Sequence, residues 1–199
     1  KLKNSLLKNG NIDKDYIFVL HDKMSEYIYN ICTYRKIIIE KLLKKSKIIE
    51  KNLTDFKEDI DLEYISDFIN LNKEQIKEIL DEHINIEIMR KSSVKGIQRD
   101  DISILINNME VSKYGSQGQN RTALLTLKLA NFEILMEEKE QIPILLLDDI
   151  MSELDSHRIG FLLDYIKNYQ SIITTTDSSF AKNANNILIR NVVNGEIKI

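Results

Sequence analysis

The sequence contains few of the residues that cross-link a fold or interrupt its regular elements. Among 199 residues there is one cysteine, Cys32, which excludes a disulfide framework and a zinc site built from several cysteines. One proline and six glycines leave long stretches without a chain breaker, so long regular elements are expected. No apolar run approaches the roughly 18 residues of a membrane span, and the first residues do not form a secretory signal. We therefore expect an intracellular chain with no membrane partner.

A strong excess of one charge is also missing. The 28 basic and 31 acidic residues give a net charge of −3, which says little about partners. With 43% apolar and 30% charged residues, the composition is typical of a globular chain that buries a core without cross-links. The three histidines, His21, His83 and His157, lack the spacing of metal ligands and are expected to be surface or helix-face residues.

The first 90 residues are expected to be mainly helical. From Asp15 to Asn52 there is no glycine or proline, and apolar residues recur at helical spacings, namely at Ile28, Ile31, Ile38, Leu42 and Ile49. A helix of about 37 residues would be about 55 Å long, which we interpret as an arm. Cys32 is expected to be a packing residue of this helix. A short strand near residues 59–66 and a helix from Lys73, capped by Asn72, complete this part.

After about residue 90, strands alternate with helices. Residues 102–111 predict a β-hairpin with Asn107-Asn108 in the turn, and a helix is expected over 119–138 with Leu124, Leu127 and Ala130 facing inward. The apolar runs 144–147 and 172–173 predict parallel strands that are buried on both faces, joined by a helix over 156–168. A last pair of strands should close at Asn194-Gly195. The expected fold is α/β, a mostly parallel sheet with flanking helices over 91–199, next to a helical arm over 1–90.

The chemically important residues lie where the predicted strands end. Asp148 and Asp149 directly follow an apolar strand, whose backbone would hold both carboxylates rigidly. The first could bind Mg²⁺, and the second could orient a water for attack on a γ-phosphate. The alternative interpretation is an ordinary solvated turn at a strand end.

Two further segments open predicted helices. In Ser116-Gln117-Gly118-Gln119, a hydroxyl, a glycine and a helix N-terminus together could bind an anion. The same four residues could equally form a plain helix cap. Ser152-Glu153-Leu154-Asp155, by itself, is a capping sequence.

Residues 116–119 resemble the signature motif of ABC-type, SMC-like ATPase heads from DNA-repair proteins. The apolar strand that ends at Asp148-Asp149 resembles their Walker B motif, and residues 152–155 resemble their D-loop. The resemblance is strongest to the RecF family of recombination mediators, and it extends to residues 98–101 and 174–177. It implies half of an ABC-type head joined to an arm. The site residues implied are Ser116, Gln117, Gly118 and Gln119 (ATP of a partner subunit), Asp148 (Mg²⁺), Asp149 (catalysis), Ser152 and Asp155 (D-loop), and Thr175 and Thr176 (switch region).

Basic residues of the long helix are the candidate DNA contacts, namely Arg35, Lys41, Lys44 and Lys45. The length and the sign of the basic cluster over 41–51 suit phosphate contacts. The alternative interpretation of this cluster is a solvated helix face.

The sequence departs from the family in informative places. Gly96-Ile97-Gln98-Arg99 stands where the family has Gly-Pro-His-Arg, so a role for that histidine cannot be transferred. Asp149 stands where transporter heads have glutamate, which suggests slow hydrolysis. No Gly-x4-Gly-Lys-[Ser/Thr] segment occurs, so the phosphate-binding Walker A loop is missing from these residues. We therefore expect the chain to be a C-terminal portion of such a protein, and to be inactive alone.

By resemblance, the full-length protein would be an ATP-dependent homodimer that clamps gapped DNA or single/double-strand junctions. It would be a weak DNA-dependent ATPase that helps load recombinase, with a RecR-like partner, during DNA replication, recombination and the SOS response. Its location would be cytoplasmic and nucleoid-associated. One alternative is a non-enzymatic scaffold. Another is a different SMC-like DNA-repair head, for which an arm of about 55 Å is short.

Overall fold

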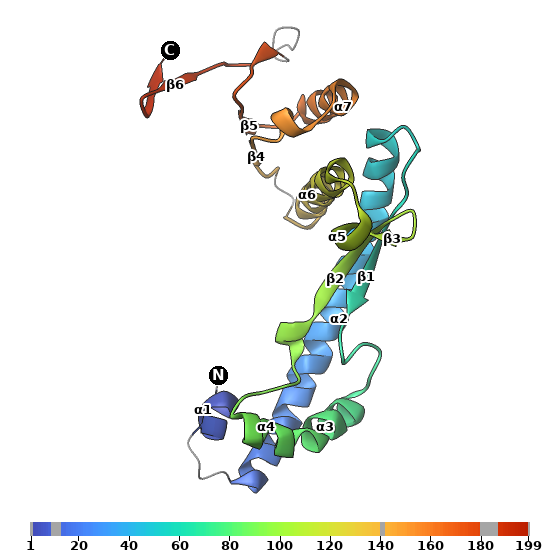
Figure 1. Cartoon of the computed structure of the whole chain (residues 1–199), viewed down its shortest axis with the longest axis vertical. Helices are drawn as coiled ribbons and strands as arrows, with labels where there is room; N and C mark the ends of the chain where they lie inside the picture. The colour runs from blue at the N-terminus through green and yellow to red at the C-terminus, as the bar shows by residue number, and fades with distance from the viewer. Residues whose placement is uncertain (1, 9–12, 140–141, 180–186, 199) are drawn as a thin grey trace. The chain divides into compact units, whose positions relative to one another are not determined.

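The computed structural model describes residues 2–8, 13–139, 142–179 and 187–198 (Figure 1). The chain forms two compact units. The first consists of Lys1–Leu43 and Asp61–Leu105, and the second of Lys44–Ile60 and Ile106–Ile199. The expected functional boundary between an arm and a head near residue 90 stays a prediction. In the ranges described, no helix combines the length and the apolar character needed to cross a bilayer.

The predicted long helix is confirmed as α2 (Lys14–Leu53), with 40 residues. Most of its buried positions recur at spacings of three, four or seven, the repeat of a helix that buries one narrow stripe. Ile38, which was expected on this stripe, is 52% exposed, whereas Ile39 is buried. One residue further along a helix turns a side chain by about 100°, so the error is one of phase. The buried stripe includes Ile28, Cys32, Ile39, Ser46, Ile49 and Leu53.

Three short helices accompany α2 in the first unit: α1 (Leu2–Lys8), α3 (Lys73–Glu82) and α4 (Ile84–Arg90) (Figure 1). Asn72 begins α3 with the predicted cap, because its side chain accepts from the Gln75 N–H at 2.9 Å and the Gln75 side chain accepts from the Asn72 N–H at 3.0 Å. Among the described residues of this unit, one small core contains Ile28, Cys32, Phe68, Ile76 and Leu80, and another contains Leu7, Ile17 and Ile84.

His21, predicted to be a surface or helix-face residue, lies on the buried face of α2. It is fully buried, and its Nδ1 lies 2.6 Å from a carboxylate oxygen of Asp81. Burial lowers the pKa of His21, and the hydrogen bond to Asp81 opposes this effect. The hydrogen bond to Asp81 offsets part of the cost of burying this polar side chain. The sequence around His21 does not indicate it, because Asp81 is 60 positions away.

Strands β1 (Ile60–Ile65), β2 (Asp101–Ile106) and β3 (Met109–Glu110) form one sheet in that order, with a 3-10 turn η1 (Ile97–Arg99) before β2. Asn107 and Asn108 have φ angles of 50° and 64°, which confirms the predicted turn. The Asn107 N–H donates to the Asp59 carbonyl at 2.9 Å, and the Asp59 N–H donates to Asn107 Oδ1 at 3.0 Å. The second strand of the predicted hairpin, β3, is shorter than expected, because Val111 begins the helix α5 (Val111–Tyr114).

Helix α6 (Gln117–Lys139) confirms the helix predicted over 119–138, but its buried face differs from the expected one. Leu124 is 56% exposed, whereas Leu125 and Leu129 are buried. Apolar residues are so dense in this helix that the sequence pattern is almost equally compatible with a buried face rotated by one residue. Ala130 is buried as predicted.

Strands β4 (Leu145–Asp148) and β5 (Ser171–Thr174) are parallel, as predicted, and α7 (Ser156–Ile166) lies between them in the sequence. Burial on both faces was a wrong expectation. Leu145 and Leu147 are buried, but Leu146 is 66% and Ile172 is 55% exposed. Within the described residues, this sheet has two strands and one covered face. The predicted last pair is confirmed as β6 (Asn191–Val193) and β7 (Glu196–Lys198), which are antiparallel.

Candidate functional site

The parallel pairing of β4 and β5 brings polar residues together at one end of the two strands. In the register of this pair, Asp148 lies opposite Thr174. The Thr174 hydroxyl donates a hydrogen bond to the Asp148 carboxylate. The main-chain N–H of Asp149 donates to the carbonyl oxygen of Thr174 at 3.1 Å and lies 3.0 Å from its hydroxyl oxygen. Thr174 therefore fixes the positions of both aspartates.

Asp149 leaves the strand through a left-handed backbone conformation, with φ at 48°. Aspartate tolerates this region better than most residues, because its short polar side chain can bond locally. The chain then turns through η2 (Met151–Glu153), where the Ser152 hydroxyl donates to the Asp149 carbonyl at 3.0 Å. The side chains of Asp148 and Asp149 are both exposed. The strand end thus presents two carboxylates on a rigid turn.

The predicted D-loop residue Asp155 is the N-cap of α7. Its carboxylate accepts from the Arg158 N–H at 2.9 Å and forms an ion pair with the Arg158 side chain at 2.6 Å. The main-chain hydrogen bond from Arg158 holds the pKa of Asp155 below its usual value. The capping interpretation of this segment is confirmed, and a D-loop role remains a prediction.

The predicted signature segment begins α6 with a reciprocal cap. Ser116 Oγ accepts from the Gln119 N–H at 3.2 Å, and Gln119 Oε1 accepts from the Ser116 N–H at 3.0 Å. Just before it, Gly115 is sterically required, because a Cβ there would lie 2.6 Å from the carbonyl oxygen of Val111. The interpretation of this segment as a helix cap is therefore confirmed, and contact with a nucleotide of a second copy remains a prediction.

Gly118 has no such requirement. A Cβ at this position would meet no atom closer than 3.9 Å within the described chain. Glycine inside a helix costs up to about 1 kcal/mol relative to alanine. Packing within the described chain does not require this glycine, whereas close approach of an external group to the first turn of α6 would benefit from it.

Thr174 is a site residue that the sequence analysis did not single out. From the run Thr174–Asp177, the sequence predicts Thr175 and Thr176 as the switch residues. In the structure, Thr175 Oγ1 donates to the Asp177 carbonyl at 3.0 Å and forms a local turn, and Thr176 is exposed. The missing information was the strand register, which places the first threonine of the run opposite Asp148.

The candidate DNA-binding residues have different surroundings. Arg35 donates to the Ile97 carbonyl at 2.8 Å and pairs with Asp100, which also accepts from the Tyr64 hydroxyl at 2.5 Å. Burial, and then the hydrogen bond to Asp100, raise the pKa of Tyr64. Lys45 pairs with Glu133 at 3.2 Å and with Glu137. Lys41 and Lys44 are exposed. A role of the four residues in DNA binding stays a prediction.

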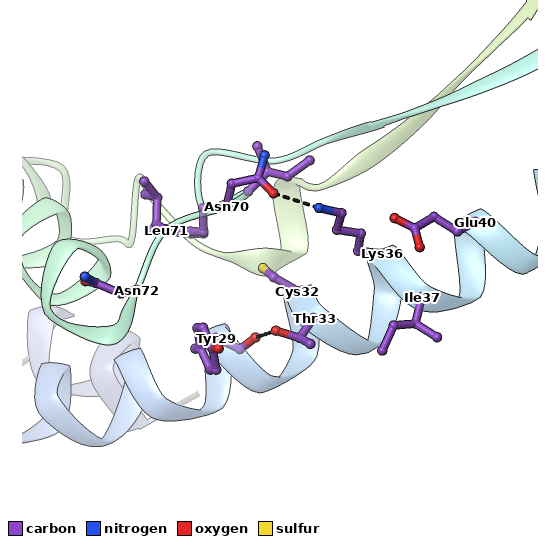
Figure 2. Close-up of a pocket in the computed structure, with 11 residues that line it drawn as sticks. Tyr29, Cys32, Thr33, Lys36, Ile37, Glu40, Asn70, Leu71 and Asn72 are labelled. Atoms are coloured by element: carbon purple, nitrogen blue, oxygen red, sulfur yellow. Dashed lines mark hydrogen bonds between the residues drawn. The ribbon is translucent and has the colours of Figure 1, made fainter.

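A groove of about 610 Å³ lies in the first unit, between α2 and the segment that precedes α3 (Figure 2). Lys36 reaches across it to the side chain of Asn70 at 2.9 Å, as Figure 2 shows. Cys32 borders the groove with only 6% exposure, and it accepts a hydrogen bond from the Tyr64 hydroxyl at 3.5 Å. Its predicted packing role is confirmed.

The residues at the end of β4 fit a magnesium ion that is held mainly by a nucleotide. No group of three or more histidine, cysteine or acidic side chains suited to a metal ion occurs in the part of the chain that the structure describes. Mg²⁺ in nucleotide sites uses one or two carboxylates together with phosphate oxygens and waters. The exposed Asp148 carboxylate, held by the Thr174 hydroxyl, provides such a ligand.

Comparison with known proteins finds close relatives, although no family model matches. The chain is 39% identical over 202 residues to the DNA replication and repair protein RecF of Clostridium perfringens (strain SM101 / Type A), covering 98% of this chain and 55% of that protein. It is 37% identical to the protein of the same name from Lactococcus lactis subsp. cremoris (strain MG1363), covering 100% of this chain and 55% of the relative. The chain thus spans about half the length of the curated relatives it matches.

Two solved structures share the fold. One is the recombination mediator protein RecF-ATPrS in the RecFOR pathway, with a TM-score of 0.78 and 31% identity, covering 98% of this chain and 54% of that one. The other is RecF-ATP in the same pathway, with a TM-score of 0.75 and 34% identity, covering 89% and 50%. These likenesses confirm the predicted fold class, half of an ABC-type head with a parallel sheet, joined to a mainly helical region.

Proposed function

This chain belongs to the RecF family of DNA replication and repair proteins, and from this premise we propose that it supplies one half of an ATP-dependent, dimerising DNA clamp. The observation that carries the proposal is the β4–β5 strand end, where Thr174 holds Asp148 and Asp149 on a rigid turn. Carboxylates at the carboxyl end of parallel strands are placed where such folds bind nucleotides. The relatives solved as RecF-ATP and RecF-ATPrS support ATP as the ligand.

In this proposal the two aspartates have separate tasks. Asp148 would hold Mg²⁺, which neutralises phosphate charge when it is bound. Asp149 would orient the attacking water, and its backbone is already held by two contacts to Thr174. Because both carboxylates lie at a strand end and not on a long loop, the backbone that carries them would need little rearrangement when ATP and Mg²⁺ bind. An aspartate is shorter than the glutamate of transporter heads, which agrees with slow hydrolysis.

The start of α6 would serve the nucleotide that is bound to a second copy of the protein. Its first-turn N–H groups and helix dipole favour an anion, and Ser116 offers a hydroxyl. Gly118 leaves the first turn open to close approach. Ser152 and Asp155 would form the D-loop, and Thr175 and Thr176 would belong to the switch region.

For the full-length protein we propose weak DNA-dependent ATPase activity, with ATP and Mg²⁺ as cofactors. The dimer would bind gapped DNA or single/double-strand junctions through basic residues such as Lys44, and would act with a RecR-like partner in recombinase loading. This work would take place in the cytoplasm at the nucleoid, during replication, recombination and the SOS response. The 199 residues alone contain no Gly-x4-Gly-Lys loop, so we expect them to bind ATP weakly.

A scaffold without enzymatic activity is the second candidate. The observation in its favour is that Ser116, Gln119 and Asp155 all make ordinary helix caps. In that case the capped helices would only serve assembly.

The substitution Ser116→Arg in the full-length protein separates the two candidates. A bulky cation at this helix start leaves no room for a partner's nucleotide, so ATP-dependent dimers should be lost while ATP binding by the monomer is kept. Ser112→Arg is the matched control, because it adds the same group to α5, outside the cap. Light scattering with and without ATP measures the dimers, and a fluorescent ATP analogue measures binding. Normal dimers of Ser116→Arg would favour the scaffold.

A further inference from the structure

Two carboxylates from the end of α2 and the loop after it bond to one face of α6. The Thr126 hydroxyl donates to the Glu50 carboxylate, and the Gln119 side-chain amide donates to Glu58 Oε1 at 3.0 Å. Gln119 and Thr126 are seven residues apart, which places them on the same face of the helix, two turns from each other. All four residues lie in the second compact unit. We call them the acidic seam.

Glu58 is fixed relative to the last turn of α2. Its main-chain N–H donates to Thr54 Oγ1 at 3.3 Å, and that hydroxyl donates to the Glu50 carbonyl at 2.8 Å. The second carboxylate oxygen of Glu58 is buried and has no hydrogen-bond partner among the residues described. An unsatisfied buried oxygen costs stability, so packing alone does not favour a glutamate here.

The contact has a chemical consequence for the start of α6. A side-chain amide can present either its oxygen or its nitrogen to a neighbour. An ionised carboxylate only accepts hydrogen bonds, so Glu58 requires the nitrogen of Gln119 on its side. The oxygen of Gln119 then faces the Ser116 N–H, which it accepts at 3.0 Å. Glu58 thereby sets the amide orientation on which the reciprocal cap depends.

We propose that Glu58 is a positioning residue for the Ser116–Gln119 segment: it selects the amide orientation of Gln119 and so holds Ser116 in the conformation that meets a nucleotide on a second copy. The importance of this role for dimerisation rests on the proposed function. Glu58 acts through Gln119 and does not itself touch the ligand. The loop that follows the long helix thus belongs, in function, to the nucleotide-contacting surface.

The first experiment measures the local effect in the 199-residue chain. Glu58→Ala should increase hydrogen exchange at the Ser116 main-chain amide several-fold, because its acceptor is no longer held, while the melting temperature changes little. Glu58→Gln keeps an acceptor but adds a donor, so both orientations of the Gln119 amide can be satisfied and the exchange rate should lie between those of the wild type and Glu58→Ala. Asp59→Ala, which removes the neighbouring acidic group, is the matched control and should also leave the rate unchanged. Unchanged exchange in Glu58→Ala would overturn the proposal.

The second experiment measures ATP-dependent dimerisation of the full-length protein. Glu58→Ala should raise the dimer dissociation constant about tenfold, the scale of one lost hydrogen bond, with ATP affinity of the monomer unchanged. Glu58→Gln should give an intermediate dissociation constant, because its amide can also donate. If the wild type dimerises and Glu58→Ala does so equally well, or if Asp59→Ala is equally defective, the positioning role is wrong. If the wild type does not dimerise with ATP, the proposed clamp function is wrong. The hydrogen-exchange measurement then tests by itself whether Glu58 positions Gln119 and Ser116.

Discussion

The hydroxyl of Thr174, at the end of β5, donates a hydrogen bond to the carboxylate of Asp148, at the end of β4. The two residues are 26 positions apart and are register partners in the parallel sheet. A threonine at this position therefore restrains the carboxylate that we expect to bind Mg²⁺. Groups that orient a metal ligand in this way affect function almost as strongly as the ligand itself.

Thr174→Val keeps the shape of the side chain and removes this hydrogen bond. We expect ATP turnover by the full-length protein to fall about tenfold or more, the scale found for groups that orient metal ligands. Thr174→Ser should retain most of the activity. Thr33→Val is the control, because Thr33 is an exposed threonine on α2 that lies outside the candidate site. An equal loss in both valine variants would mean that the Asp148 contact is not the cause.

Asp149→Asn tests the proposed role in water activation. Asparagine tolerates a φ of 48°, so the fold and ATP binding should be preserved. Turnover should slow by roughly 10²-fold, the scale of a lost general base, and the ATP-bound dimer should persist on DNA. Asp164→Asn changes an exposed carboxylate on α7 and serves as control. Unchanged turnover would move the catalytic role to another residue, with Thr175 and Thr176 as the next candidates.

Glu50→Gln tests the effect of burying a carboxylate in the acidic seam. Burial raises the pKa of Glu50, and the hydrogen bond from Thr126 opposes this less strongly. The folded chain therefore holds the proton more tightly than the unfolded chain does. The stability that comes from protonated Glu50 is complete below the unfolded pKa and is lost as the pH rises through the raised folded pKa.

Glutamine keeps the acceptor for Thr126 and removes the charge. At pH 8 the free energy of unfolding of the 199-residue chain should rise by about 1 kcal/mol, and the gain should shrink toward pH 5. Urea unfolding at both values measures this difference, with the exposed Glu40→Gln as control. A gain that grows toward acidic pH would contradict the assigned direction of the pKa shift.

Alanine substitutions of Arg35 and Lys44 test which basic residues of α2 stabilise the fold and which contact DNA. Arg35→Ala leaves the Asp100 carboxylate, which is 5% exposed, without its ion pair. It should lower the free energy of unfolding by about 2 kcal/mol. Lys44→Ala should change stability by less than about 0.5 kcal/mol but reduce the salt dependence of DNA binding by about one phosphate contact. DNA titrations at several salt concentrations, together with urea unfolding, measure both effects. An unchanged salt slope for Lys44→Ala would remove it from the candidate DNA contacts.

Local features of the fold could be predicted from the sequence because their causes are local. The absence of breakers predicts α2, the Asn72 side chain predicts the start of α3, and two adjacent asparagines predict the turn at 107–108. The end of β4 at Asp148 follows from a short apolar run that closes with two carboxylates.

Features that depend on packing between distant segments could not be predicted. The phase of α6 depends on what covers it, and the dense apolar residues around Leu124 allow more than one phase. The contact between Thr174 and Asp148 needs the strand register, and the contact between Glu58 and Gln119 joins residues 61 positions apart. The burial of His21 has the same origin, because its partner Asp81 is 60 positions away.

The open face of the β4–β5 pair determines how the 199-residue chain will behave at high concentration. Leu146 and Ile172 are register partners, and both are more than half exposed. Adjacent apolar side chains on an uncovered pair of strands favour association with other chains. Aggregation of the purified chain should therefore begin at this face, and a lysine in place of Leu146 would suppress it while leaving the buried Leu145 and Leu147 untouched.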